Sequence, residues 1–438
     1  MSVRTGRLRP ILQPLALTYM AGHIVSVFGD VSLFLAINWL VYEKTGSATA
    51  VSVAALLEAL PILLLGAPAG ALVDRYDRRV LLIICDLVRV SAVLTVALLH
   101  ERLGLFALYA LILTENLAST VFMPARSAML PSLLPRESIA LANSVMGFTR
   151  QGVQIAAFGL GGVLLPILGF RGVALIDAGT FALSLLTLLV LLLRAGPQRR
   201  YNRDRSYGRT LLEGFQYAWR TRWVRLLLLV FAAGSFATAP VFTLTPIYAE
   251  RVLGGNAATY GMLEACLVVG LLVGNLAGGV LERAGLGRLL IGGIACMGAG
   301  LLLAADTQAV WVGAAMYGII GAAMAMINIA AFSLLQTRVP PRQQGRTFSL
   351  LTSVSAGATP FTLVVTGPLT DLFGLQPIFW AAGFLLFLVG AGAFLERTLP
   401  NVDRAPLARG QYSAGEARGG NRLRRLRWPS PGAGGPAP

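Results

Sequence analysis

Several acidic and basic side chains lie inside long apolar stretches, where they could bind protons or a charged ligand. Asp30 and Glu115 lie near the middle of two such stretches, and Arg150 lies within a third. A charged side chain near the centre of a bilayer costs about 2.5 to 3.5 kcal/mol or more, so it needs a partner or a function. Because burial favours the neutral form of a carboxyl group, a buried acid can exchange a proton near neutral pH. Proton transfer, ion pairing and binding of a cationic compound are therefore the available chemistries.

Other kinds of chemistry find no support in the motifs. No nucleophile, base and orienting group can be assembled from them, so we do not expect an enzyme. No Gly-xxxx-Gly-Lys-Ser/Thr loop is present, which argues against direct use of ATP. The only histidines, His23 and His100, are too far apart for ligand spacing, and the three cysteines lie in apolar stretches. We expect neither a metal site nor a cofactor.

The elements that must position these charged residues are membrane helices. Hydrophobic residues make up 56% of the chain and charged residues only 13%, far below the roughly 25% of a soluble domain. A length of 438 residues leaves room for about twelve helices of roughly 20 apolar residues each. The composition predicts an all-α integral membrane protein with twelve transmembrane helices.

The placement of the basic residues predicts the orientation in the membrane. The formal net charge is +16, but with a cytoplasmic amino terminus 30 of the 36 Lys and Arg residues fall in inside segments and four in outside loops. This asymmetry follows the positive-inside rule and predicts that both termini are cytoplasmic. The basic residues are thus explained by the lipid bilayer, and we expect no nucleic-acid partner.

A short charged joint occurs twice and divides the chain into two like halves. The first copy contains Gly70, Asp74, Arg75, Arg78 and Arg79, and small residues at Gly66 and Gly70 favour close helix packing. The second copy, about 208 residues later, contains Gly274, Gly278, Glu282, Arg283 and Arg288. A Leu-Glu-Ala triplet precedes each copy, around Glu58 and Glu264. The repeat predicts two pseudo-symmetric six-helix halves.

The predicted organisation has five segments. Residues 1–10 form a cytoplasmic tail, 11–193 the first half, 194–223 a cytoplasmic linker with an amphipathic helix, 224–396 the second half and 397–438 a disordered basic tail. Prolines at 124, 131 and 135 predict a cytoplasmic turn over residues 124–137.

These motifs resemble those of the major facilitator superfamily, whose fold is two six-helix halves around a central cavity. The helix 2 to 3 loop motif appears here as Gly70, Asp74, Arg75, Arg78 and Arg79. Phe28-Gly29-Asp30, the run from Phe122 to Pro131 and Leu141-Ala142-Asn143-Ser144 are similar to the bacterial exporter branch with macrolide efflux proteins and the enterobactin exporter. The Gly-Pro-x-x-Gly-Gly motif of many drug antiporters is only partly matched, at Gly161 and Gly162.

The resemblance implies roles for the intramembrane acids. Asp30 and Glu115 would line the central cavity as proton carriers or as partners of a cationic substrate; alternatively, Asp30 would fix its helix by local hydrogen bonds. Arg150 would neutralise one of the acids, and Asp86 and Arg89 would form a local pair. Other cavity-facing candidates make an apolar surface with few polar groups: Tyr19, Asn116, Phe236, Thr243, Met324 and Asn328.

The resemblance also implies two roles where the halves meet. Glu58 and Glu264 would occupy equivalent positions at the interface, with proton transport as the alternative. Asp74 would face the amino-terminal end of the eleventh helix, whose dipole favours an anion, and so hold the outward-open state. The alternative for the joint is a purely topological signal.

We therefore expect a monomeric secondary transporter of a bacterial cytoplasmic membrane. It would export small amphipathic, drug-like molecules by proton antiport with alternating access. The alternatives are a siderophore or lysophospholipid transporter, a proton symporter for uptake, and a non-transporting membrane sensor or scaffold.

Overall fold

The computed structural model describes residues 13–194, 221–281 and 285–396, and within these ranges the chain is helical apart from short turns. The predictions for the two tails and for most of the linker at 194–223 concern residues outside these ranges. Eleven of the described helices are long and apolar enough to cross a membrane. The expected all-α membrane fold is confirmed.

The first half consists of five helices, one of which crosses the membrane twice. They are α2 (Pro14–Thr45), α3 (Ala48–Arg75), α4 (Arg78–Leu99), α5 (Leu105–Leu133) and α6 (Arg136–Arg194). The 59 residues of α6 include Gly169, whose φ of 66° no helical residue adopts. Ala142 and Leu191, near the two ends of α6, pack in one apolar cluster, so the chain reverses at Gly169. Its two arms account for the twelfth crossing.

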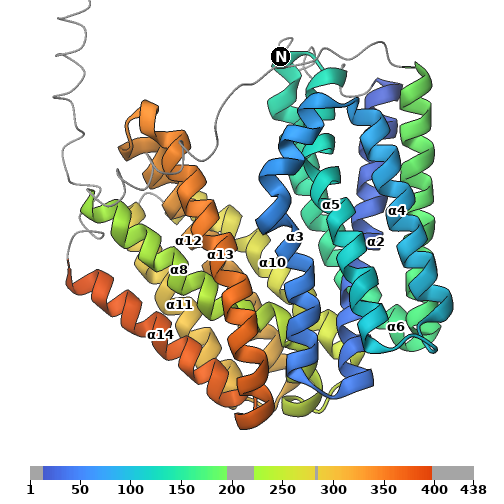
Figure 1. Cartoon of the computed structure of the whole chain (residues 1–438). Helices are drawn as coiled ribbons and strands as arrows, with labels where there is room; N and C mark the ends of the chain where they lie inside the picture. Colours follow the sequence, from blue (N-terminus) through green and yellow to red (C-terminus); the bar gives the residue numbers. More distant parts are fainter. Residues whose placement is uncertain (1–12, 195–220, 282–284, 397–438) are drawn as a thin grey trace, which may run out of the picture.

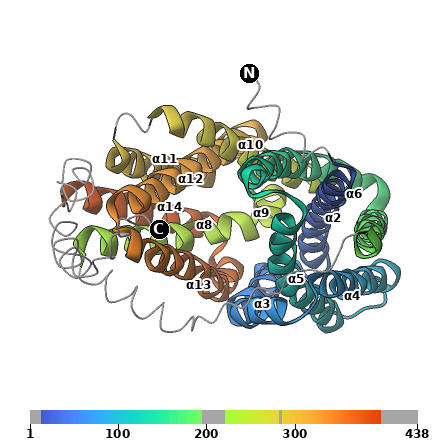
Figure 2. The same cartoon turned by 90° about the horizontal axis from the view of Figure 1, so that it is seen from above.

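The second half repeats this plan after a short break in its first helix. It consists of α8 (Arg222–Thr243), the short α9 (Thr245–Ile247), the π-helical turn η1 (Tyr248–Val252), α10 (Ala257–Leu281), α11 (Leu286–Asp306), α12 (Val310–Arg338), α13 (Pro341–Phe373) and α14 (Gln376–Leu395). Seen from above, the two halves lie side by side, with α6 next to α10 and α3 next to α13 (Figure 2).

The halves touch at one end of the molecule and diverge toward the other (Figure 1). Where they touch, a Cβ atom added to Gly261 of α10 would lie 2.5 Å from the Phe158 carbonyl oxygen of α6, and one added to Gly367 of α13 would lie 2.7 Å from Ser52 Oγ of α3. Only glycine permits backbones to approach this closely. We call this the closed end; it carries the turn at 46–47 and the C-terminus of α13. The opposite end, with the charged joint at 74–79, is the open end.

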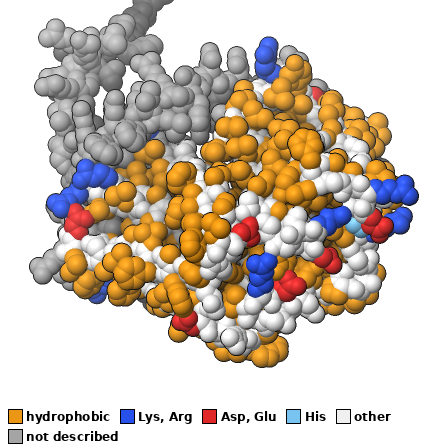
Figure 3. All heavy atoms as spheres, turned by 60° about the horizontal axis from the view of Figure 1, so that its bottom comes forward, with side chains coloured by type: hydrophobic (Ala, Val, Ile, Leu, Met, Phe, Trp, Pro, Cys, Tyr) orange, Lys and Arg blue, Asp and Glu red, His pale blue; other side chains and the backbone are white. Residues whose placement is uncertain are grey.

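The outer surface is suited to lipid. Large apolar side chains are exposed all along the helices, including Phe106 (86% exposed), Leu193 (85%) and Trp311 (78%). Figure 3 shows apolar side chains across most of the visible face, with charged side chains in small groups. Such a surface would be an aggregation hazard in water and is stable in hydrocarbon.

Two local expectations are wrong. The turn predicted from residue 124 is not formed there, because α5 continues as helix through Pro124 and Pro131 to Leu133. Membrane helices tolerate proline when neighbouring groups satisfy the freed carbonyl groups. The close packing expected at Gly66 and Gly70 is also absent: a Cβ atom at Gly70 would have nothing within 4 Å, and one at Gly66 would meet only Ile62 of its own helix.

Candidate functional site

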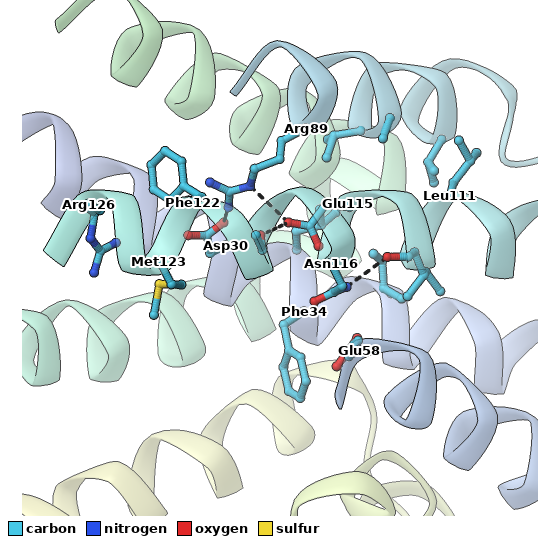
Figure 4. A pocket seen from close by; sticks show the side chains of 17 residues that line it. Asp30, Phe34, Glu58, Arg89, Leu111, Glu115, Asn116, Phe122, Met123 and Arg126 are labelled. Carbon is cyan, nitrogen blue, oxygen red and sulfur yellow. Dashed lines mark hydrogen bonds and ion pairs between the residues drawn. The ribbon is translucent and has the colours of Figure 1, made fainter. Parts of the chain in front are cut away.

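A polar cavity of about 200 Å³ opens inside the first half, between α2, α3, α4 and α5. It is lined by apolar residues together with three carboxyl groups, two guanidinium groups and one amide: Asp30, Glu58, Glu115, Arg89, Arg126 and Asn116. Figure 4 shows Asp30, Arg89 and Glu115 pointing toward one another, with Glu58 apart from them on the adjoining helix. We call this the charged cavity.

Arg89 of α4 is the centre of the charged cavity. Its guanidinium group pairs with Asp30 of α2, donates from Nε to Glu115 Oε1 of α5 at 3.1 Å, and lies 3.5 Å from Asp86 Oδ1 through Nη1. Arg89 is only 3% exposed, whereas Asp30 is 34% and Glu115 20% exposed. One buried cation thus pairs with carboxyl groups from three helices, and two of those carboxyl groups are accessible from the cavity.

The surroundings of Arg89 fix its orientation. The Phe181 ring lies 3.8 Å and the Phe122 ring 5.0 Å from the guanidinium carbon, at cation–π distances. Ser184 of α6 donates to Asp86 at 2.8 Å, and Ser119 donates to Glu115 at 2.8 Å. A planar group with five donors can serve several carboxylates at once, which a lysine ammonium group cannot do with the same geometry.

The sequence predicted the acidic residues of this cluster, but it did not predict which arginine pairs with them. Asp30 and Glu115 lie together as expected of cavity residues, and the Asp86–Arg89 pair is present but belongs to a larger network. Arg150 is exposed on α6, and no ion pair among the described residues includes it. In this conformation Arg89 neutralises the acids, and a role for Arg150 stays a prediction.

Arg126 is a second cation that sequence reasoning placed outside the membrane. The predicted turn put it at the surface, but the continuation of α5 brings it to the charged cavity. Its guanidinium carbon lies 6.0 Å from the Phe122 ring, and its backbone carbonyl accepts a 2.8 Å hydrogen bond from the Tyr19 hydroxyl of α2. The spacing of four between Phe122 and Arg126 placed both on one helix face and could have indicated this position.

The second half presents an apolar surface to the space between the halves. A depression of about 580 Å³ between α8, α12 and α13 is lined by aromatic and aliphatic groups with several hydroxyl groups and one amide, and no ionisable residue of the described chain lines it. Of the candidates named from the sequence, Thr243, Met324 and Asn328 line this depression, whereas Phe236 packs against Phe361 at 6.4 Å. The two halves therefore differ in chemistry: charged on one side, apolar on the other.

The paired acids Glu58 and Glu264 have different surroundings. Glu58 is half-buried and lines the charged cavity. Glu264 of α10 is only 2% exposed and lies three residues beyond Gly261, where α10 touches α6. Their interface role stays a prediction.

The charged joint lies at the open end. Asp77 caps α4 by accepting from the Arg79 N–H at 2.9 Å, and Arg78 donates to the Ala128 carbonyl at 3.0 Å. Asp74 and Arg75 are exposed at the end of α3. In the second copy, Gly278 packs on Ile329 of α12 and Arg288 is exposed, while Glu282 and Arg283 lie outside the described residues. The holding role of Asp74 stays a prediction.

A different carboxyl group connects the halves at the closed end. Asp371 of α13 accepts hydrogen bonds from Ser47 Oγ at 2.6 Å and from the N–H groups of Ala48 and Thr49 at 2.7 and 2.9 Å. It thereby caps the N-terminus of α3, where an anion is favoured. Nearby, Arg251 of η1 donates to the Tyr42 hydroxyl at 3.1 Å and to the Gly46 carbonyl. The second half thus holds the first through five hydrogen bonds.

The part of the chain that the structure describes contains no group of three or more residues suited to a metal ion, and its three cysteines are free.

Comparison with known proteins agrees with this architecture. The family model described as Major Facilitator Superfamily matches residues 19–362. "Macrolide efflux protein A" of Streptococcus pyogenes is 25% identical over 377 residues, covering 85% of this chain and 93% of the relative. "Multidrug efflux pump Tap" of Mycolicibacterium fortuitum is 27% identical over 401 residues, covering 89% of this chain and 96% of the relative.

Solved structures show the same fold at low sequence identity. A bacterial homologue of the iron transporter ferroportin in an inward-facing state superposes with a TM-score of 0.72 at 17% identity, covering 88% of this chain and 98% of that one. The nucleoside transporter NupG gives a TM-score of 0.71 at 11% identity, covering 87% of this chain and 99% of that one.

Proposed function

Because the chain belongs to the Major Facilitator Superfamily and is a multi-pass membrane transporter, not an enzyme, we propose that it exports amphipathic, drug-like molecules in exchange for protons. The observation that carries the proposal is the charged cavity, in which Asp30 and Glu115 share one buried cation while remaining accessible. The efflux functions named for the two relatives support the direction and the substrate class.

The two halves suit an amphipathic molecule bound between them. An apolar body would pack against the depression lined by Phe231, Phe242 and Phe332, and a cationic group would approach the acids of the charged cavity. Arg89 alone cannot balance Asp30, Glu115 and Asp86 if all three are ionised, and Arg126, the second cation of the cavity, is in none of the ion pairs of the described residues. A proton or a substrate cation would supply the missing positive charge, and competition between them would couple export to proton entry.

The two unlike ends support alternating access as part of this proposal. If both termini are cytoplasmic, as the basic residues predict, the open end faces the cytoplasm of a bacterial cell and this conformation is inward-open. The glycine contacts and the Asp371 and Arg251 hydrogen bonds would then close the outer side. No second copy of the chain is needed to complete the cavity, so we propose a monomer.

The coupling assignment is tested by neutralising each acid. We expect Asp30→Asn and Glu115→Gln each to lower proton-coupled efflux at least tenfold at normal expression, because each removes a proton-binding group from the cavity. Substrate efflux and proton uptake would be measured together in proteoliposomes. Asp306→Asn, at an exposed acid that binds Trp380 within one half, is the matched control and should transport normally. Unchanged coupled efflux in both cavity variants would contradict the assignment.

A further inference from the structure

Glu264 is a buried acid that the charged cavity does not explain. Its side chain is 2% exposed, and its Oε1 atom has no hydrogen-bond partner among the described residues. None of the ion pairs of the described chain includes it. An ionised carboxylate buried without a cation carries a large desolvation cost, and protonation removes that cost. The surroundings therefore favour a proton on Glu264 in this conformation.

The groups around Glu264 are neutral hydroxyls. Thr245 of α9 lies beside it, and Tyr317 of α12 donates to Thr245 Oγ1 at 3.3 Å. Tyr248 of η1 stacks on Tyr317 with ring centroids 5.6 Å apart. Tyr260, one turn before Glu264 on α10, lies within electrostatic reach of it. None of these groups supplies a positive charge.

Tyr260 connects Glu264 to the first half. Its hydroxyl is also buried without a hydrogen-bond partner, and its ring stacks on Trp39 of α2 with centroids 6.5 Å apart. Tyr260 lies within electrostatic reach of Glu58 as well as of Glu264. Tyr260 thus lies at the contact between the halves, in the electrostatic surroundings of both acids.

Glu264 lies within one helical turn of the contact that closes this end of the molecule. Gly261 lies on α10 between Tyr260 and Glu264 and meets the backbone of α6 at Phe158 and Gly162. Separation of α10 from α6 and α2 would expose the turn of α10 that carries Tyr260 and Glu264. The acid thus lies next to the surface that must separate when this end opens.

We propose that Glu264 is a second proton-binding site, in the second half, and that its protonation is required for the closed end to close. This inference rests on the proposed exchange of protons and adds a carrier to it. A proton from the outer side binds Glu264 while that end is open, and closure buries it. Release of the proton to water in the charged cavity requires a movement that brings the Tyr260 hydroxyl into hydrogen-bond contact with Glu264 and Glu58, because this hydroxyl has no hydrogen-bond partner in the present conformation. Glu264 is then a carboxylate when the closed end reopens.

The test measures closure without substrate. The full chain, with its three cysteines replaced, would carry spin labels at Glu101→Cys and Gln308→Cys, two exposed residues in turns at the closed end, one in each half. Distances between the labels would be measured in lipid nanodiscs at pH 6 and pH 9. We expect a population with separated labels to grow at least fivefold at pH 9 in the otherwise unchanged chain.

Replacement of Glu264 gives the decisive comparison. Glu264→Gln, which imitates the protonated side chain, should keep the labels close at both pH values. Glu264→Met, apolar and of similar volume, should do the same and serves if the glutamine variant folds poorly. Glu43→Gln, at an exposed acid of α2 near the same end, should keep the full pH response.

A full pH response in Glu264→Gln or Glu264→Met would overturn the proposal, as would no pH response in the unchanged chain. The label experiment contains no substrate, so it tests closure independently of export. If the export proposal fails, proteoliposomes will show no substrate-linked proton movement, while the label distances will still depend on Glu264.

Discussion

At the scale of single residues, the molecule depends on one buried arginine. Arg89 is enclosed by two phenylalanine rings and holds Asp30, Asp86 and Glu115. Several carboxylates around one cation form a network whose members cannot be removed independently. The same cluster that stabilises the first half therefore also holds the groups to which we assign proton exchange.

Removal of Arg89 should destabilise the fold as well as the function. We expect Arg89→Met to lower stability by about 3 to 5 kcal/mol, because the buried acids lose their cation. Thermal unfolding in detergent would show a lower midpoint and lower yield. Arg102→Met, at an exposed residue of the turn between α4 and α5, should unfold at the original temperature. An unchanged midpoint for Arg89→Met would refute the central position of this residue.

The acids were predictable from the sequence, and their partner was not. A carboxyl group inside an apolar stretch can be recognised from the sequence alone, as Asp30 and Glu115 show. Which of Arg89, Arg126 and Arg150 pairs with these acids depends on how the helices pack against one another. The spacing of residues within one helix does not determine that packing. Glu58 and Glu264 show the same limit, since a symmetric repeat gave them one role and the structure gives them different surroundings.

At the scale of helices, α3 and α13 are arranged reciprocally. At the closed end, Asp371 near the C-terminus of α13 caps the N-terminus of α3. At the open end, Asp74 near the C-terminus of α3 would face the N-terminus of α13 when that end closes. If this prediction holds, each helix offers an acid to the start of the other, and rocking of the halves would form one contact as it breaks the other.

Neutralising these two acids should move the molecule in opposite directions. A lost cap costs about 1 kcal/mol, which is roughly a fivefold change in a conformational ratio. We expect Asp371→Ala to increase the separation of labels at Glu101 and Gln308, and Asp74→Ala to reduce it. If both variants changed the label separation in the same direction, these two acids would not control the equilibrium between the two conformations.

The glycine contact between α6 and α10 gives an independent test of closure. A Cβ atom at Gly162 would lie 2.8 Å from the Gly261 Cα atom, whereas one at Gly159, a turn earlier on α6, would have nothing within 4 Å. Gly162→Ala should therefore separate the closed-end labels, and Gly159→Ala should leave them unchanged. Equal behaviour of the two variants would mean that this contact does not limit closure.

Helix existence was predictable, and helix ends were less so. The apolar stretches predicted the crossings, and the repeat predicted the halves. The prolines at 124 and 131 were misleading because a membrane helix continues where its neighbours satisfy the backbone, as α5 does to Leu133. The close helix packing predicted from Gly66 and Gly70 is absent for another reason. Neither glycine contacts a neighbouring helix in this conformation, and the sequence does not determine which conformation is populated.

At the scale of the whole molecule, the two halves share a fold but divide the chemistry. The first half carries the charged cavity, and the second half carries an apolar depression and the enclosed Glu264. Rocking of one half against the other would expose these groups to one side of the membrane at a time. Substrate export and proton entry would then be two outcomes of the same movement.

The most direct test of this account is simultaneous measurement of substrate and proton fluxes in proteoliposomes with an imposed pH gradient, using a macrolide and a panel of cationic dyes. The account predicts that at least one compound moves against its gradient while protons move in the opposite direction, and that Asp30→Asn with Glu115→Gln abolishes both movements. Uphill transport without proton movement, or with protons moving in the same direction as the compound, would contradict it.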